Sequence, residues 1–163
     1  DAAKQRVLSI NPECIVRTYA VFYTPETAGQ FDFTRYDYIV DAIDLVSCKL
    51  DLIQQARERR IPILTALGTG NKLQPELLTI TDIAKTSGCP LARVMRKELR
   101  GRGIHHLKVA FSPEQPGQTQ QLETPPPGRR SVPASVSWVP PVAGLLMAGT
   151  VVQDLLNGGG LIP

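Results

Sequence analysis

The sequence predicts an α/β fold in which a mainly parallel sheet is flanked by helices. Two short apolar runs, residues 38–42 and 61–67, have the length and composition of strands buried in a parallel sheet. A helical pattern over residues 45–60 lies between them, and strand, helix and strand in this order form a βαβ unit with parallel strands. The second run closes with a glycine-rich turn, Gly68 to Asn71, which fits the end of a strand.

The elements before this unit are predicted from the spacing of apolar residues and from residues that begin or end helices. Residues 2–10 follow helical spacing, and Asn11-Pro12 ends that helix. Residues 14–22 alternate apolar and polar side chains, which predicts a strand. Thr24-Pro25 then predicts the start of a short helix that ends near Phe31.

The second half of the chain predicts two more strands and two helices. The strands are expected at residues 77–83 and 107–111, a basic helix at 90–99 and an apolar helix at 140–157. Residues 112–130 contain five prolines and two glycines, so we expect a flexible loop there. The predicted organisation is one domain over residues 1–157, followed by a tail at 158–163.

Composition narrows the class of protein. The 163 residues are 42% hydrophobic and 20% charged with a net charge of +3, which is ordinary for a compact soluble domain. No stretch reaches roughly 18 uninterrupted apolar residues, and the start lacks a signal peptide's apolar core. Three cysteines without a close pair favour a reducing compartment, so a cytoplasmic protein that does not bind membranes is expected. Two adjacent histidines do not build a zinc site.

The most informative single position is Asp44, directly after the predicted strand at 38–42. Ligands of open α/β sheets bind beyond the carboxyl ends of the strands, so an acid placed there can bind magnesium or a ribose and phosphate group. The alternative is that Asp44 caps the helix that starts at Leu45. Position alone favours capping slightly.

Lys49 and the glycine-rich turn are weaker candidates. Lys49 follows Asp44 by one and a half helical turns and can reach a phosphate only if that turn faces the crevice; a solvated lysine is the ordinary alternative. Gly68 and Gly70 allow close backbone approach to a ligand, but the sequence GTGNK is neither a Walker motif nor a dinucleotide fingerprint. A plain tight turn explains it equally well.

Basic residues are concentrated between residues 91 and 108. Six of them against the single acid Glu98 give this stretch a charge of +5, so the rest of the chain carries −2. The six are Arg93, Arg96, Lys97, Arg100, Arg102 and Lys108. Such a run either contacts a nucleic-acid backbone or forms a solvated helix face, and charge alone gives the two interpretations even weight.

A series of blocks resembles one known family. The blocks YIVDAIDLVSCK, IPILTALGTGNKLQP and ITDIAKTSGCPLARVMRKELRGRGI, together with INPEC, VFYTPE and the apolar helix, resemble the ThiF/MoeB/HesA superfamily of adenylating proteins. Within it they are similar to the tRNA threonylcarbamoyladenosine dehydratases. The resemblance implies a Rossmann-like adenylating-enzyme fold.

The resemblance also implies an activity. It implies an enzyme that uses ATP and Mg²⁺ to adenylate the threonyl carboxylate of N6-threonylcarbamoyladenosine in tRNA, which then closes to a cyclic hydantoin with loss of water. Asp44 matches the family's aspartate at the magnesium and ATP site, and the cofactor site is expected to include Phe22, Asp44, Lys49, Gly68 and Gly70. The basic run then becomes a surface for tRNA, and the apolar helix is expected to contribute to a homodimer.

The resemblance leads to two further expectations. Family members begin with a GxGxxG turn, an acid for the ribose and an arginine that this sequence lacks, so we expect a C-terminal portion without the nucleotide-binding half, inactive by itself. The alternative function is activation of a ubiquitin-like or sulfur-carrier protein. It is disfavoured because paired CxxC knuckles are missing, and sulfur-relay partners are doubtful because Leu107 to Ala110 contains no cysteine.

Overall fold

The computed structural model describes residues 1–117, 120, 124–125 and 132–158, and it divides into two compact units, residues 1–31 and 32–163. The first unit begins with α1 (Ala2–Ile10), as predicted. Residues 14–22 form no strand, which corrects the prediction from alternation. A strand requires a partner for its backbone hydrogen bonds, and the described sheet offers these residues none.

The short helix predicted after Thr24 is reduced to a turn and the 3-10 helix η1 (Ala28–Gln30). The Thr27 hydroxyl accepts a hydrogen bond from the Thr24 amide at 2.8 Å and donates one to the Phe22 carbonyl at 2.6 Å. These local bonds satisfy the backbone without a longer helix. Phe31 is the last residue of this unit, and the centroid of its ring lies 4.9 Å from that of Tyr19.

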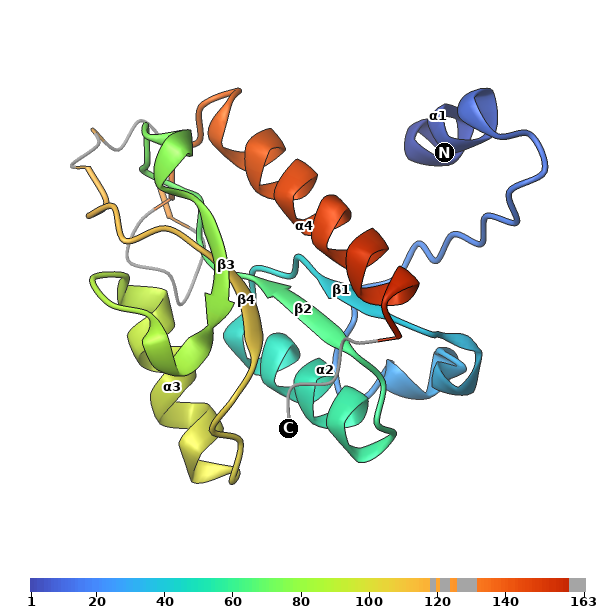
Figure 1. Ribbon diagram of the computed structural model, residues 1–163, viewed down its shortest axis with the longest axis horizontal. Coiled ribbons are helices and arrows are strands. Elements are labelled where there is room, and N and C mark those ends of the chain that lie inside the picture. Colours follow the sequence, from blue (N-terminus) through green and yellow to red (C-terminus); the bar gives the residue numbers. More distant parts are fainter. Residues whose placement is uncertain (118–119, 121–123, 126–131, 159–163) are drawn as a thin grey trace. The chain divides into compact units, whose positions relative to one another are not determined.

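The second unit contains a four-stranded sheet in the order β1-β2-β4-β3 (Figure 1). Its strands are β1 (Ile39–Asp41), β2 (Ile63–Ala66), β3 (Thr79–Asp82) and β4 (Lys108–Phe111). Strands β1, β2 and β4 are parallel, whereas β3 runs antiparallel to β4. The predicted α/β, Rossmann-like fold with a mainly parallel sheet is therefore confirmed.

Helices cover both faces of this sheet. On one face α2 (Val46–Glu58) and α3 (Pro90–Gly101) pack through Ile53, Met95 and Leu99 against Val109 of β4. On the other face α4 (Val139–Leu156) places Met147 against Leu64 and Ala110. Successive residues of a strand point to opposite faces, so Val109 and Ala110 belong to different cores. Two small 3-10 helices, η2 (Phe33–Arg35) and η3 (Pro75–Leu77), precede β1 and β3, and η4 (Ile83–Lys85) follows β3.

Helix α4 differs from the expectation that no segment resembles a membrane span. Its 18 residues have a hydropathy of 1.4, so by length and composition alone it can cross a membrane, and only 17% of that window is buried. A search for an uninterrupted apolar run missed it because Gln153 and Asp154 interrupt the pattern. The Asp154 carboxylate accepts hydrogen bonds from Tyr38 at 2.7 Å and Lys108 at 2.6 Å, which fixes this end of α4 to the sheet.

Candidate active site

The carboxyl ends of three parallel strands meet at one edge of the sheet. Residues 42–45 follow β1, Gly68 to Asn71 follow β2, and Ser112 follows β4. Ligands of open α/β sheets bind at this edge. The sequence-predicted residues Asp44, Gly68 and Gly70 therefore lie on neighbouring loops of one edge.

Asp44 is exposed in a bend between β1 and α2. Helix α2 begins at Val46, its N-cap is Leu45, and no side chain caps it. The capping role that position alone favoured is therefore not what the structure shows. The carboxylate faces solvent at the ligand-binding edge of the sheet.

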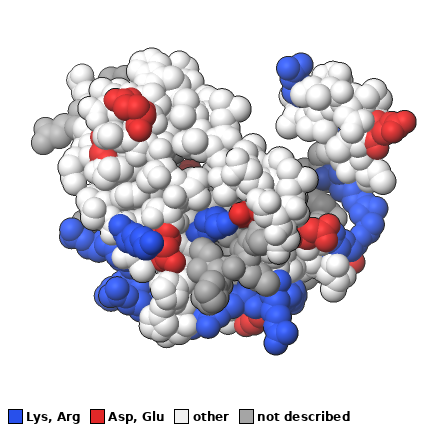
Figure 2. Space-filling model, in the orientation of Figure 1, with Lys and Arg blue, Asp and Glu red and all other residues white. Residues whose placement is uncertain are grey.

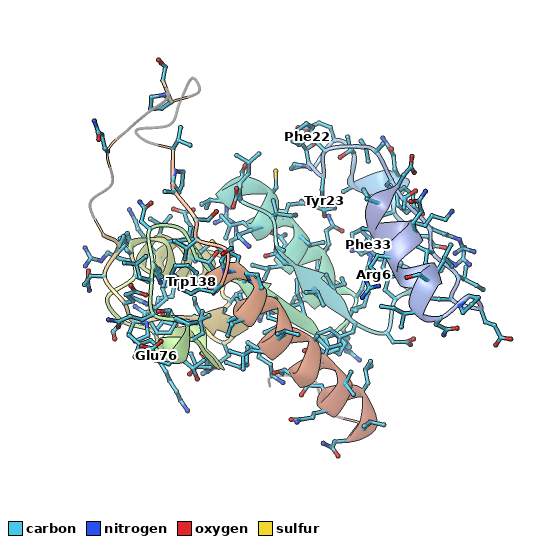
Figure 3. All side chains as sticks on the ribbon, turned by 90° about the horizontal axis from the view of Figure 1, so that it is seen from above. Arg6, Phe22, Tyr23, Phe33, Glu76 and Trp138 are labelled. Atoms are coloured by element: carbon cyan, nitrogen blue, oxygen red, sulfur yellow. The ribbon has the colours of Figure 1, made fainter. Side chains whose placement is uncertain are left out.

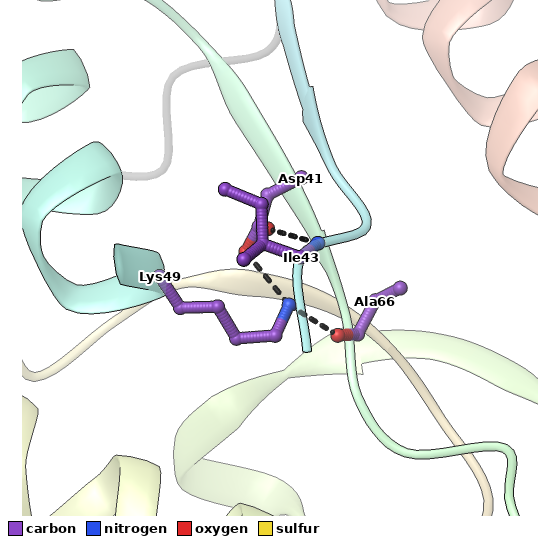
Figure 4. A network of polar contacts seen from close by, with 4 residues as sticks. All are labelled: Asp41, Ile43, Lys49 and Ala66. Carbon is purple, nitrogen blue, oxygen red and sulfur yellow. Dashed lines mark hydrogen bonds and ion pairs between the residues drawn. The ribbon is translucent and has the colours of Figure 1, made fainter. Parts of the chain in front are cut away.

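Lys49 is buried, with 2% of its side chain exposed, and forms an ion pair with Asp41, which is completely buried (Figure 4). Its ammonium lies 2.9 Å from Asp41 Oδ2 and 2.8 Å from the Ala66 carbonyl oxygen, to which it donates hydrogen bonds. Burial lowers the pKa of Lys49, and the carboxylates of Asp41 and Asp44 oppose that shift. The solvated lysine considered from the sequence is wrong, and the buried ion pair occupies the ammonium that was expected to reach a phosphate.

Sequence reasoning did not single out Asp41. An acid at the end of an apolar strand with a lysine eight residues later, on the inner face of the next helix, is the signal that would have identified the pair. Asp41 Oδ1 also accepts a hydrogen bond from the Ile43 amide at 2.9 Å. Both of its oxygens are therefore engaged within the protein.

Gly70 packs against Pro133, so its backbone is not open to a ligand. A Cβ atom at Gly70 would lie 2.8 Å from Pro133 Cβ. The next residue, Asn71, accepts a hydrogen bond from the Ala134 amide and donates one to the Ala134 carbonyl, both at 2.7 Å. At Gly68 a Cβ would meet only Leu91, at 3.6 Å. Of the two glycines, Gly68 is therefore the less crowded.

The loop from Gly68 to Gln74 binds Glu114, near the start of the proline-rich segment, and Trp138, beyond its end. The Glu114 carboxylate accepts hydrogen bonds from the amides of Leu73 and Gln74 at 2.8 and 3.1 Å. Trp138, labelled at the beginning of α4 in Figure 3, donates its indole N–H to the Leu73 carbonyl at 2.9 Å. Much of the loop predicted to be flexible, and residues 159–163 of the predicted tail, lie outside the described residues.

A second lysine of the same loop, Lys72, is also buried, with 2% exposed. Its ammonium donates to the Ser112 carbonyl at 2.8 Å and lies 6.0 Å from the centroid of the Phe111 ring. Burial lowers its pKa, and the nearby Cys89 and Glu114 oppose the shift. The sequence pattern gave no indication of this burial.

Phe22 belongs to the first unit, where it is 84% exposed and is labelled in Figure 3. Its carbonyl accepts the hydrogen bond from Thr27. The other expected cofactor residues belong to the second unit. That Phe22 shares a site with these residues stays a prediction.

The six basic residues do not form one surface. Arg93, Lys97, Arg100 and Arg102 are exposed on α3 and at its end. Blue side chains gather at the lower left of Figure 2, the region of α3 in Figure 1. Arg96 instead donates to the Thr86 carbonyl at 2.8 Å and to the Thr86 hydroxyl. Lys108 points to the opposite face of the sheet, where it pairs with Asp154 of α4.

The edge of the sheet offers one exposed carboxylate to a divalent cation. No group of three or more His, Cys, Asp or Glu side chains in the described ranges can hold a metal. Magnesium keeps several waters and needs only one or two carboxylates in addition to substrate phosphates. Asp44 supplies an exposed carboxylate, and the internal bonds of Asp41 exclude it from the ligand set.

Comparisons with known proteins show the family to which this chain belongs. The profile of the ThiF family matches residues 1–159. The chain is 39% identical to the tRNA threonylcarbamoyladenosine dehydratase of Bacillus subtilis over 96% of this chain and 65% of that protein. It is 40% identical to the Escherichia coli protein of the same name over 59% of this chain and 36% of that one.

Solved structures agree with the sequence comparisons. The E. coli tRNA N6-threonylcarbamoyladenosine dehydratase in complex with AMP superposes with a TM-score of 0.79 at 28% identity, covering 95% of this chain and 63% of that one. Its complex with ATP gives a TM-score of 0.67 at 29% identity, covering 92% and 64%. The chain thus spans less than two thirds of the length of these relatives.

One sequence-based expectation is overturned. The family profile matches from residue 1, and the Bacillus subtilis relative and the solved structures cover at least 92% of the chain. The expectation of a C-terminal portion without the nucleotide-binding half is therefore wrong. It rested on the absence of a GxGxxG turn, a ribose-binding acid and an arginine, whereas the family profile matches residues 1–159.

Proposed function

This chain belongs to the ThiF family, and we propose that it takes part in ATP-dependent dehydration of N6-threonylcarbamoyladenosine in tRNA. The relatives named as tRNA threonylcarbamoyladenosine dehydratases, and the solved structures of one of them with AMP and with ATP, support the choice. The observation that carries the proposal is the exposed Asp44 carboxylate at the carboxyl edge of the parallel strands.

The proposed chemistry makes a carboxylate oxygen into a leaving group. Adenylation of the threonyl carboxylate by ATP releases pyrophosphate; attack by the carbamoyl nitrogen, which gives up a proton, then closes the ring and releases AMP. Mg²⁺, when bound with ATP, offsets the charge that develops on the phosphates. In this scheme the exposed Asp44 carboxylate would hold the metal, and the less crowded Gly68 would allow the backbone to approach the nucleotide.

The first test examines the tRNA substrate and the role of Asp44 together. We expect cells without the gene to lose the tRNA nucleoside that is lighter by one water and to accumulate the open form, measured by mass spectrometry. Complementation by Asp44→Asn is expected to fail, because a charge-stabilising group of this kind contributes about 100-fold or more to the rate. An unchanged nucleoside profile would contradict the proposal and favour activation of a sulfur-carrier or ubiquitin-like protein.

The four exposed basic residues at α3 support binding to the tRNA backbone. Each phosphate contact changes the slope of log affinity against log salt by about 0.9 for duplexes. Replacing Arg93, Lys97 and Arg100 with alanine is expected to weaken tRNA binding and flatten this slope. Lys108→Met, on the opposite face, is the matched control and is expected to leave the slope unchanged. Equal slopes for the triple variant and the parent would indicate that these residues of α3 form a solvated face and do not contact tRNA.

The outer face of α4 supports a homodimer. Leu145, Val152 and Leu156 are 73%, 56% and 80% exposed and lie seven and four residues apart, so they form one apolar stripe. A second copy that presents the same stripe would bury it. Sedimentation is expected to give a dimer that Leu145→Glu with Val152→Glu converts to monomer. A monomeric parent at micromolar concentration would contradict the dimer.

Inactivity of the 163 residues by themselves stays a prediction. ATP–pyrophosphate exchange in the presence of substrate tRNA measures it directly. Absence of exchange is the expected result, and measurable exchange by these residues alone would show the prediction to be wrong.

A further inference from the structure

The buried ion pair lies directly beneath the loop that carries Asp44. Lys49 bridges the ends of two strands, because its ammonium binds the Asp41 carboxylate on β1 and the Ala66 carbonyl on β2 (Figure 4). Asp41 continues the connection through its second oxygen to the Ile43 amide, one residue before Asp44. A continuous chain of hydrogen bonds therefore runs from the end of β2 to the residue preceding Asp44.

Stability alone is a poor explanation for this arrangement. Burying two charges costs desolvation that their attraction often only repays, and well-packed apolar residues are frequently as stable. The pair instead engages both oxygens of the Asp41 carboxylate and the Ala66 carbonyl, which favours one conformation of the loop after β1. The pair therefore acts on Asp44 through the backbone, because the Ile43 amide that Asp41 binds is one residue before it.

We propose that Asp41 and Lys49 are positioning residues that hold the Asp44 carboxylate in place for the magnesium ion of bound ATP. The proposal rests on the proposed function, because it assumes that Asp44 contacts that metal. Neither residue touches the metal or the nucleotide in this scheme. Their role is exercised through the Ile43 amide, which is one residue before Asp44.

The test uses paired substitutions, because removing one partner would leave a buried charge unpaired. Asp41→Asn with Lys49→Met removes both charges but keeps an acceptor for the Ile43 amide. Asp41→Ala with Lys49→Met removes that acceptor too. Thr65→Val is the matched control: Thr65 is completely buried opposite Asp41 in the β1–β2 register, and its hydroxyl has no hydrogen-bond partner in the described part of the chain.

Two readouts separate positioning from a merely structural role. Calorimetric titration of ATP at several magnesium concentrations gives the magnesium dependence of binding by the folded protein. Hydrogen exchange of the Ile43 and Asp44 amides reports the order of the loop without any ligand. Global destabilisation lowers the melting temperature but does not change the magnesium dependence of the molecules that remain folded.

The expected result is a graded one. Outer residues that orient a metal ligand typically contribute 10- to 100-fold to metal affinity, so we expect about that loss in magnesium-dependent affinity for the Ala–Met variant and a smaller one for Asn–Met. Exchange at Ile43 and Asp44 should accelerate in the same order. Thr65→Val should match the parent in both measurements.

The outcomes distinguish this proposal from the function on which it rests. If Asp44→Asn loses the magnesium dependence but both paired variants keep it with unchanged exchange, the positioning role is wrong and the proposed function stands. If Asp44→Asn binds magnesium and ATP like the parent, the proposed function fails, and the positioning role for a metal ligand fails with it. In that case, faster hydrogen exchange of the Ile43 and Asp44 amides in the paired variants would show that Asp41 and Lys49 have a structural role only.

Discussion

Two lysines at the same edge of the sheet are equally buried but differently paired. Lys49 and Lys72 are each 2% exposed, yet Lys49 binds the carboxylate of Asp41, whereas Lys72 binds the Ser112 carbonyl and faces the Phe111 ring. No carboxylate in the described ranges forms an ion pair with Lys72. Burial of a lysine at this edge therefore has two different causes. Lys49 is held by the charge of Asp41, whereas Lys72 is held by a backbone carbonyl beside the loop from Gly68 to Gln74.

The largest expected effect comes from separating the paired lysine from its acid. Lys49→Met leaves the Asp41 carboxylate buried and unpaired, so the free energy of unfolding should fall by about 3–5 kcal/mol. Asp41→Asn with Lys49→Met should recover most of that loss. Urea denaturation measures both, and equal stability of the single and paired variants would contradict the charge-pair account of this loop.

A smaller effect is expected where backbone packing holds the other loop. Gly70→Ala places a methyl group 2.8 Å from Pro133 Cβ, so a local shift should cost about 1–3 kcal/mol. Gly68→Ala is the matched control, because its methyl meets only Leu91 at an ordinary 3.6 Å. Thermal denaturation compares the two. Similar melting temperatures would mean that segment 132–138 does not hold this loop.

The smallest change in stability near neutral pH is expected for Lys72→Met. The substitution removes a buried ammonium without leaving an unpaired carboxylate, so loss of one hydrogen bond and gain of an apolar side chain should nearly cancel, within about 1 kcal/mol. A loss as large as that of Lys49→Met would remove the distinction between the two lysines.

The pH dependence of the free energy of unfolding tests the burial of Lys72. Burial lowers the pKa of Lys72 below its ordinary value of 10.5, so between the folded-state pKa and 10.5 the unfolded chain binds more protons than the folded one. This lysine therefore destabilises the fold at lower pH, and its contribution should improve as pH rises through the folded pKa toward 10.5. Unfolding measured between pH 7 and 10 should show that rise in the parent, reduced in Lys72→Met. Identical slopes would contradict the prediction.

Periodicity predicted the parts of the fold that local pattern determines. The strands β1, β2 and β4 and the helices α2, α3 and α4 lie within the predicted ranges or one to two residues from them, because each presents its apolar residues at a regular spacing. The strand expected at residues 14–22 failed because alternation does not supply a partner strand. The reversed direction of β3 likewise depends on pairing with β4, which local pattern does not encode.

The site was predictable to the same limit. Asp44 follows from its place after β1, which the local pattern establishes. Contacts such as Gly70 with Pro133 join residues 63 apart, and the loss of Lys108 from the basic surface depends on which face of β4 it occupies. The link between Asp41 and Lys49 stands between these cases, because its eight-residue spacing is visible in the sequence but its burial depends on the packing of α2 on the sheet.

The most direct test of the account is the magnesium dependence of ATP binding by Asp44→Asn, measured by calorimetry beside the parent protein. The role proposed for the exposed Asp44 carboxylate after β1 is to hold the metal of the bound nucleotide. The predicted result is that magnesium strengthens ATP binding in the parent and has little effect in the variant, with the melting temperature unchanged. The same magnesium dependence in both proteins would contradict the claim.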